Sequence, residues 1–166
     1  LIAPVLSFTA EEIWQHLPGE REESVHLARF PRFESSLLDS ALNERYQQLL
    51  AVRSDVSKAL ELARNTKLIG HSLDARVLLE VPAGPMADLL NRYRDELASL
   101  FIVSQAELVN GLADAHSGEM VPELKIRIEK ARGDKCQRCW NYSPTVGEDR
   151  EHPAACLRCR EALKAS

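Results

Sequence analysis

The chain has 166 residues, of which 45% are apolar, and a formal net charge of −4 at pH 7. This length and composition predict one ordinary core with a small appendage and exclude two full-sized domains. No apolar run approaches the ~20 residues of a membrane span, and no signal-peptide pattern appears, so we expect a cytoplasmic protein without a membrane partner. Because the chain begins at Leu1, inside an apolar segment and without methionine, it reads as part of a longer protein.

The charged residues are unevenly distributed. Residues 132–166 contain 7 Lys or Arg against 5 Asp or Glu, whereas residues 1–131 contain 14 against 20. Only the C-terminal segment is therefore basic. Such a small excess is weak evidence for a nucleic-acid partner when taken alone.

A short helix is predicted near the N-terminus. The Thr-Ala-Glu-Glu segment at 9–12 matches a capping box, in which the threonine hydroxyl accepts the amide of the last glutamate. Phe8 is placed to pack against Ile13 across the first turn. We expect the helix to cover about 10–17 and to end at Pro18-Gly19.

A charged loop over about 20–36, with at most a brief strand at 25–28, is predicted to precede a long amphipathic helix over about 38–66. Arg53 falls in the middle of the apolar stripe of this helix. A guanidinium there must meet a carboxylate, a carbonyl or a ligand phosphate, so Arg53 is either an intramolecular partner or a polyanion contact. The residues that define the stripe are Leu42, Tyr46, Leu49, Val56, Leu60 and Ala63.

A small mixed domain is predicted to follow the long helix. Alternation of apolar and polar residues indicates half-buried strands, and apolar residues at helical spacing indicate a helix between them. The order strand, helix, strand, strand predicts a small sheet with a helix on one face, within an α+β fold. The expected elements are strand 75–81, helix 86–100, strand 101–109, a turn-rich stretch at 111–120 and strand 124–129, with 132–135 linking to the last segment.

All four cysteines lie in that last segment. Cys136 and Cys139 form one Cys-x2-Cys pair, and Cys156 and Cys159 form another after sixteen intervening residues. Two such pairs 15 to 20 residues apart converge on a tetrahedral zinc ion. Four thiolates leave no open coordination position, so we expect one structural Zn²⁺ that fastens a segment with too few apolar residues to fold unaided.

Three alternatives to this zinc site are open. Two disulfides would suit a secreted domain, but the cysteines occupy one small region instead of stapling the core. Iron fits a four-thiolate tetrahedron too, yet the intervening segment is polar and lacks aromatic packing. His152 could replace one cysteine as a ligand, although four sulfurs make a surface histidine the simpler interpretation.

The order of long helix, small mixed domain and four-cysteine knuckle resembles the C-terminal end of the bacterial isoleucyl-tRNA synthetase family, within the class I aminoacyl-tRNA synthetases. The segments LIAP at 1–4 and FTAEEIW at 8–14 are similar to the helical anticodon-binding domain of the isoleucine, valine and leucine enzymes. The segment from Arg53 to Arg64, followed by Ile69-Gly70 and SLDA at 72–75, is similar to the next helix and junction of the family. KCQRCW at 135–140 with CLRC at 156–159 resembles the zinc module of the isoleucine enzyme and separates it from its relatives.

The resemblance implies three parts: 1–68 as the end of the helical anticodon-binding domain, 69–131 as a small α/β junction domain, and 132–166 as a zinc-binding module. It implies recognition of the anticodon stem-loop of isoleucine tRNA within a monomeric, ATP-dependent isoleucine–tRNA ligase. Leu-Ile-Gly-His at 68–71 lacks the first histidine of the class I nucleotide signature and follows a long helix. No Lys-Met-Ser-Lys-Ser segment occurs, so we expect no catalytic residue in this chain, with the aminoacylation and editing sites elsewhere.

Arg138, Trp140 and Arg158 lie on or beside the knuckles and are candidate RNA-binding residues. Unpaired loop bases stack on aromatic or guanidinium planes. Trp140 could instead cap the small core of the metal site, and the two arginines could donate to thiolate sulfur or be solvated charges. Further candidates for phosphate contacts are Arg53, Arg127, Lys130, Arg132 and Lys135.

Two other classes of function compete with tRNA recognition. A formamidopyrimidine-type DNA glycosylase has a zinc finger of similar spacing, but it needs an N-terminal catalytic proline and a helix-two-turn-helix before the finger. Leu1 begins this chain, and strand-rich sequence precedes Cys136. A protein-interaction domain would present an exposed apolar patch on the zinc module, whereas residues 141–155 are mostly polar or turn-forming.

Overall fold

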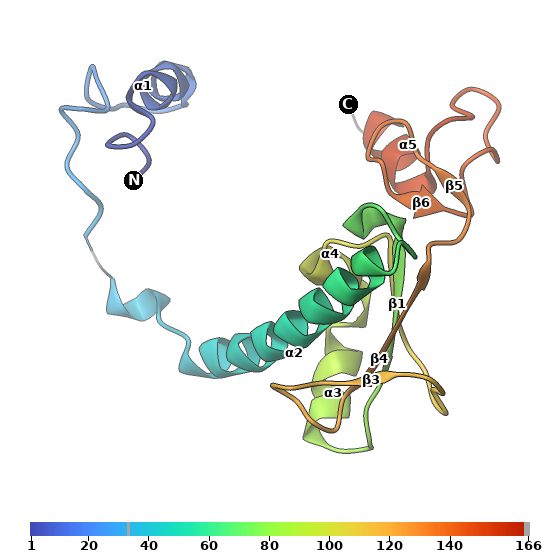
Figure 1. The fold of residues 1–166 in the computed structure, drawn as a ribbon. Coiled ribbons are helices and arrows are strands. Elements are labelled where there is room, and N and C mark those ends of the chain that lie inside the picture. The colour runs from blue at the N-terminus through green and yellow to red at the C-terminus, as the bar shows by residue number, and fades with distance from the viewer. Residues whose placement is uncertain (33, 165–166) are drawn as a thin grey trace. The chain divides into compact units, whose positions relative to one another are not determined.

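The computed structural model describes residues 1–32 and 34–164 (Figure 1). By their internal contacts the residues form two compact units, Leu1–Ser40 and Ala41–Ser166. Within the described ranges, no helix has both the length and the apolar character that a bilayer crossing requires.

The first unit contains α1 (Ser7–His16) and the short 3-10 helix η1 (Ser35–Leu37). The predicted capping box is wrong: α1 begins at Ser7, and its N-cap residue makes no side-chain cap hydrogen bond. The amide of Ala10 already donates to the carbonyl of Leu6 at 2.8 Å, so the helix starts one turn earlier than the pattern indicated. The predicted packing of Phe8 is also absent, because its side chain is 92% exposed.

The brief strand expected at 25–28 is wrong as well, since this segment forms turns. The physical reason is local. The Glu11 carboxylate of α1 accepts the Ser24 hydroxyl at 2.8 Å and the Val25 amide at 3.0 Å, which folds the chain back onto the helix. The Trp14 indole donates to the carbonyl of Glu22 at 2.8 Å and closes the same loop.

The second unit begins with the predicted long helix, α2 (Ser40–Asn65), which is confirmed. It ends at Asn65, and Lys67 just beyond it adopts the left-handed conformation (φ 59°), which is rare for a residue other than glycine. The amide of Leu68 bonds back to the carbonyl of Ala63. One face of the helix is buried against the sheet. The buried residues of this face are Leu49, Val52, Asp55, Val56, Ala59, Leu60 and Ala63.

The sheet has the strand order β2-β1-β4-β3. Its strands are β1 (Ala75–Glu80), β2 (Gln105–Leu108), β3 (His116–Ser117) and β4 (Lys125–Lys130). β1 pairs with β2 in parallel and with β4 antiparallel, so β1 is central and is buried on both faces, not half-buried as predicted. The two-residue β3 lies within the stretch predicted as turns.

The predicted helix over 86–100 is broken into α3 (Pro85–Arg92), the 3-10 helix η3 (Arg94–Glu96) and α4 (Leu97–Phe101). Ile102 then adopts the left-handed conformation, and the amide of Val103 bonds back to the carbonyl of Ala98. The second strand therefore begins at Gln105, later than predicted. The helices supply residues to one core on the sheet face that carries Ala75, Val77 and Leu79 (Figure 1).

The opposite face of the sheet is polar and ordered by ion pairs. Arg76 of β1 is buried and donates to the carboxylates of Glu107 on β2 and Glu129 on β4.

The buried carboxylate of Asp55, on α2, accepts the amides of Glu119, Met120 and Val121, each at 2.9 Å. Asp55 thereby ties the turn between β3 and β4 to α2.

The C-terminal module has a two-stranded sheet of β5 (Asp134–Lys135) and β6 (Tyr142–Ser143), followed by α5 (Leu157–Lys164). The segment predicted as a linker, 132–135, is thus partly a strand. Gly133 has φ 85°, and a Cβ on it would lie 2.3 Å from the backbone of Ser143. Only glycine can occupy this close approach without distortion.

Candidate zinc centre and nucleic-acid interface

The four predicted ligands converge on one point. The sulfur atoms of Cys136, Cys139, Cys156 and Cys159 all lie within 4.8 Å of one another, and Cys139 Sγ is 3.7 Å from Cys156 Sγ. Four sulfurs each ~2.3 Å from one zinc ion would be about 3.8 Å apart. All four cysteines are free thiols, so the alternative of two disulfides is wrong.

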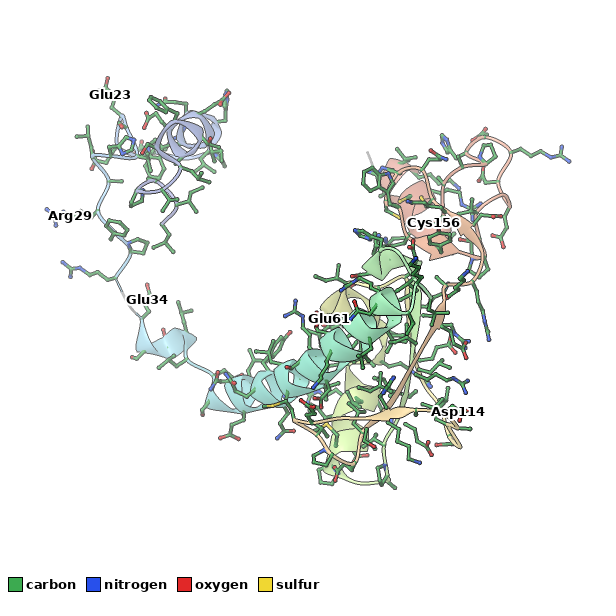
Figure 2. All side chains as sticks on the ribbon, viewed as in Figure 1. Glu23, Arg29, Glu34, Glu61, Asp114 and Cys156 are labelled. Carbon is green, nitrogen blue, oxygen red and sulfur yellow. The ribbon has the colours of Figure 1, made fainter. Side chains whose placement is uncertain are left out.

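Two different local structures present these sulfurs. The first pair lies in a tight turn after β5, where the amide of Trp140 donates to the carbonyl of Cys136 at 2.8 Å and Trp140 has φ 66°. The second pair lies at the start of α5, where Cys156 is labelled in Figure 2. The amide of Cys156 donates to Cys136 Sγ at 3.3 Å and connects the two pairs.

The protonation of the cysteines shows why this cluster calls for a cation. Burial opposes ionisation of Cys136, but backbone amides of Cys139, Cys156 and Arg138 donate to its sulfur and lower its pKa to about 6. Burial raises the pKa of Cys156 to about 12, and hydrogen bonds with the neighbouring thiols act in the same direction. Four thiolates can therefore coexist here only when a positive ion compensates their charge.

The donor set fits a structural Zn²⁺. Four sulfurs fill a tetrahedral shell and leave no position for a reacting water. The His152 side chain is exposed and lies outside the sulfur cluster, which agrees with the interpretation of a surface residue. Among the described residues, the apolar core of the module consists of Ala155 and Val146 packed with the cysteines, so a bound metal would supply most of its stability.

Arg160 is a structural residue of this module that sequence reasoning missed. Its side chain is 8% exposed and its Nη2 lies 3.2 Å from Glu148 Oε2, while Nη1 lies 3.9 Å from Asp149 Oδ2. Asp149 also accepts the amides of Glu151 and His152, which lower the pKa of its carboxyl. The sequence did contain a signal for this ion pair. An acidic pair, Glu148-Asp149, precedes the second pair of cysteines, and Arg160 directly follows the last cysteine.

The predicted RNA-binding residues of the first pair are exposed. Trp140 is 62% exposed and does not belong to the apolar core of the module, so the interpretation of a core cap is wrong. The ammonium of Lys135 lies 5.7 Å from the centre of the Trp140 ring, in a cation–π contact. Arg138 is exposed in the same turn. These three side chains form a cationic and aromatic surface beside the metal centre.

Three further candidates, Arg158, Arg132 and Arg53, form hydrogen bonds within the chain. Arg158 is exposed but donates to the Cys139 sulfur, which raises the pKa of its guanidinium. Arg132 is exposed, while its main-chain amide and carbonyl both bond to the Gln105 side chain. Arg53 Nε donates to the carbonyl of Leu100 at 3.0 Å, the intramolecular role predicted for it. Its polyanion contact stays a prediction.

Comparison with known families identifies two segments. Residues 1–79 match the anticodon-binding domain of tRNA ligase, and residues 133–162 match the zinc finger found in FPG and IleRS. The second match includes all four cysteines. An anticodon-binding segment joined to such a finger defines the class as tRNA ligase, since the finger by itself would leave two classes open.

The particular member of the class follows from whole-chain similarity. The chain is 67% identical to isoleucine–tRNA ligase of Syntrophotalea carbinolica over 98% of its length, 49% identical to that of Geobacter sulfurreducens over 99%, and 45% identical to that of Fervidobacterium nodosum over 99%. It spans 18% of the length of each of these relatives. The resemblance to the C-terminal region of isoleucine–tRNA ligase is therefore confirmed.

Proposed function

We propose that this chain is the part of a cytoplasmic, monomeric isoleucine–tRNA ligase that binds the anticodon stem-loop of isoleucine tRNA. The ATP-dependent joining of isoleucine to tRNA, and editing, take place in other parts of that ligase. The chain contributes recognition, and its zinc ion holds the recognition surface in shape. The proposal is supported by the two family matches and by the similarity to isoleucine–tRNA ligases.

The observation that carries the proposal is the exposure of Trp140 next to Lys135. A tryptophan that packs no core leaves the ring face away from Lys135 available for an unpaired base, and stacking of a base on an aromatic side chain contributes ~1–3 kcal/mol. The neighbouring ammonium can meet the phosphate of the same nucleotide. Anticodon loops present such unpaired bases.

The zinc ion has an indirect role in this proposal. The turn that carries Arg138 and Trp140 is closed by Cys136 and Cys139, so without the metal neither side chain would hold its position. Arg158 connects the second pair of cysteines to the same surface through its bond to the Cys139 sulfur. Arg132, which precedes β5, and Lys135, which lies in it, add positive charge on the segment that leads into the turn.

The experiment is a gel-shift titration of the zinc-loaded protein with isoleucine tRNA transcript, a second tRNA and duplex DNA. We expect isoleucine tRNA to bind most tightly. Trp140→Ala should weaken its binding about tenfold, whereas Trp140→Phe should retain most of it. Arg138→Ala should weaken binding, and Arg150→Ala, which removes the same charge from an exposed loop of the module, should not.

Each variant is checked for one bound zinc ion before the titration. Full affinity of Trp140→Ala and Arg138→Ala for tRNA, with zinc retained, would show that this surface does not contact RNA. A preference for duplex DNA over tRNA would support the DNA-binding alternative. Absence of binding to any nucleic acid would favour the protein-interaction alternative.

A further inference from the structure

A cavity of about 400 Å³, which Trp140 does not line, lies where three parts of the second unit meet. The end of α2 contributes Arg64, the turn after it contributes Lys67, the end of β4 contributes Lys130, and β6 of the zinc module contributes Tyr142. A volume of this order lies within the range of sites that hold small molecules, ~300–1,000 Å³. Of the residues proposed above as RNA contacts of the zinc module, Lys135, Arg138, Trp140 and Arg158, none lines this cavity.

The lining of the cavity is strongly cationic. Arg64 is oriented by a bond of 2.9 Å from its Nη2 to the Ser72 hydroxyl. Within the described part of the chain, neither Lys67 nor Lys130 forms an ion pair. The lining has one carboxylate, that of Asp74, and its Oδ2 already accepts the amides of Gly70 at 3.1 Å and His71 at 2.7 Å.

The other side of the cavity is apolar and aromatic. Tyr142 is half-buried there, and Leu68 and Ala131 lie beside it. A simple inorganic anion would use only the cationic part of such a cavity. A nucleotide would use both parts, because its phosphate can lie between lysines while its base or ribose packs on a ring.

We propose that this cavity holds one nucleotide of the bound tRNA, with its phosphate between Lys67 and Lys130 and its base or ribose against Tyr142. The inference rests on the proposed function, since it assumes that the chain binds tRNA. Tyr142 pairs with Lys135 across the β5–β6 ladder. The zinc module therefore supplies one wall, and the metal centre completes a second RNA contact as well as the first.

The test uses the double variant Lys67→Ala with Lys130→Ala in the zinc-loaded protein. Its matched control is Lys58→Ala with Lys125→Ala, which removes one lysine of α2 and one of β4 that pair with Glu119 and Glu80. Affinity for isoleucine tRNA transcript is measured over a range of salt concentrations. We expect the double variant to bind at least tenfold more weakly at low salt, with the slope of log K against log [salt] reduced by about one to two.

The control should keep the slope of the unaltered protein. Tyr142→Ala should weaken tRNA binding severalfold, and Tyr142→Phe should not. In a separate arm, AMP is titrated to distinguish a nucleotide of the RNA chain from a free nucleotide, and we expect no saturable binding of AMP in the physiological concentration range.

The outcomes separate the two proposals. If the unaltered protein fails to bind tRNA, the proposed function and this inference fail together. If it binds, an unchanged salt slope in the Lys67 and Lys130 variant overturns the inference alone, and so does an equal loss in the control. Saturable AMP binding that tRNA does not displace would also overturn it, because the cavity would then serve a free nucleotide.

Discussion

The amide of Tyr142 donates a hydrogen bond of 2.8 Å to Ser104 Oγ, which anchors a strand of the zinc module on the residue just before β2. The same hydroxyl donates to the carbonyl of Leu73 at 2.5 Å. The Gln105 side chain adds a bond in each direction to the main chain of Arg132. Because the apolar clusters of the module and of the sheet are separate, these polar bonds hold the two together.

Replacing Ser104 with alanine should loosen this junction. The Tyr142 amide and the Leu73 carbonyl would each lose a partner, at a cost of about 1–2 kcal/mol in the free energy that holds the module in place. Hydrogen exchange measured by NMR should show faster exchange of the Tyr142 amide. The control is Ser57→Ala, which removes only a bond from an exposed hydroxyl to the helix carbonyl of Arg53. Unchanged exchange of Tyr142 would contradict the proposed anchoring.

Removing the metal should unfold the C-terminal module and leave the rest of the second unit folded. Cys156→Ser, or treatment with a chelator, should abolish the bound zinc, because three thiolates and a hydroxyl bind it far more weakly and the module has almost no apolar core. Metal analysis with thiol titration should give one zinc and four protected thiols before treatment. Arg138→Ala is the control and should retain one zinc. Oxidised sulfurs without zinc in the untreated protein would refute the metal site.

Asp55 should be among the most sensitive positions of the second unit. Asp55→Asn directs an amide group at three backbone donors that now share a carboxylate, so the free energy of unfolding should fall by about 2–4 kcal/mol. Urea denaturation measures this loss. Glu61→Gln is the control, because Glu61 is an exposed residue of the same helix (Figure 2) and should change the free energy by less than about 0.5 kcal/mol. Equal effects at the two positions would show that the Asp55 bonds contribute nothing.

Glu107 should titrate below its ordinary range. The hydrogen bond from Arg76 lowers the pKa of the Glu107 carboxyl most, and burial opposes this shift without reversing it. Since the folded pKa is depressed, the pair stabilises the fold fully above the unfolded pKa of about 4.3, and this contribution is lost as the pH falls through the folded pKa. A carbon-13 NMR titration of the side chain measures the shift.

The matched variant is Arg76→Met, which removes the guanidinium but keeps an unbranched side chain in the buried position. In it the pKa of Glu107 should return to its ordinary value or rise above it. Glu107→Gln should cost about 1 kcal/mol near neutral pH, a modest value because the Glu107 side chain is 43% exposed and Glu129 still pairs with Arg76. A Glu107 pKa that does not respond to Arg76→Met would contradict this account.

Periodicity and spacing in the sequence determined the long helix, the order of helices and strands in the small mixed domain, and the convergence of the four cysteines. Each of these signals is local: a stripe at helical spacing, an alternation of period two, and two Cys-x2-Cys turns. The errors fall where local signals compete with contacts from elsewhere. The predicted helix over 86–100 breaks in three, and the apparent capping box at 9–12 lies inside a helix that had already begun.

Only the tertiary structure decided how the separate pieces meet. Nothing in a one-dimensional pattern places Asp55 under the amides of residues 119–121, Arg76 between two glutamates, or Tyr142 on Ser104. These contacts join residues far apart in the chain, and their geometry depends on strand register and on the packing of α2. The same holds for the cavity between Lys67, Lys130 and Tyr142, because its walls come from three segments that become neighbours only when the chain folds.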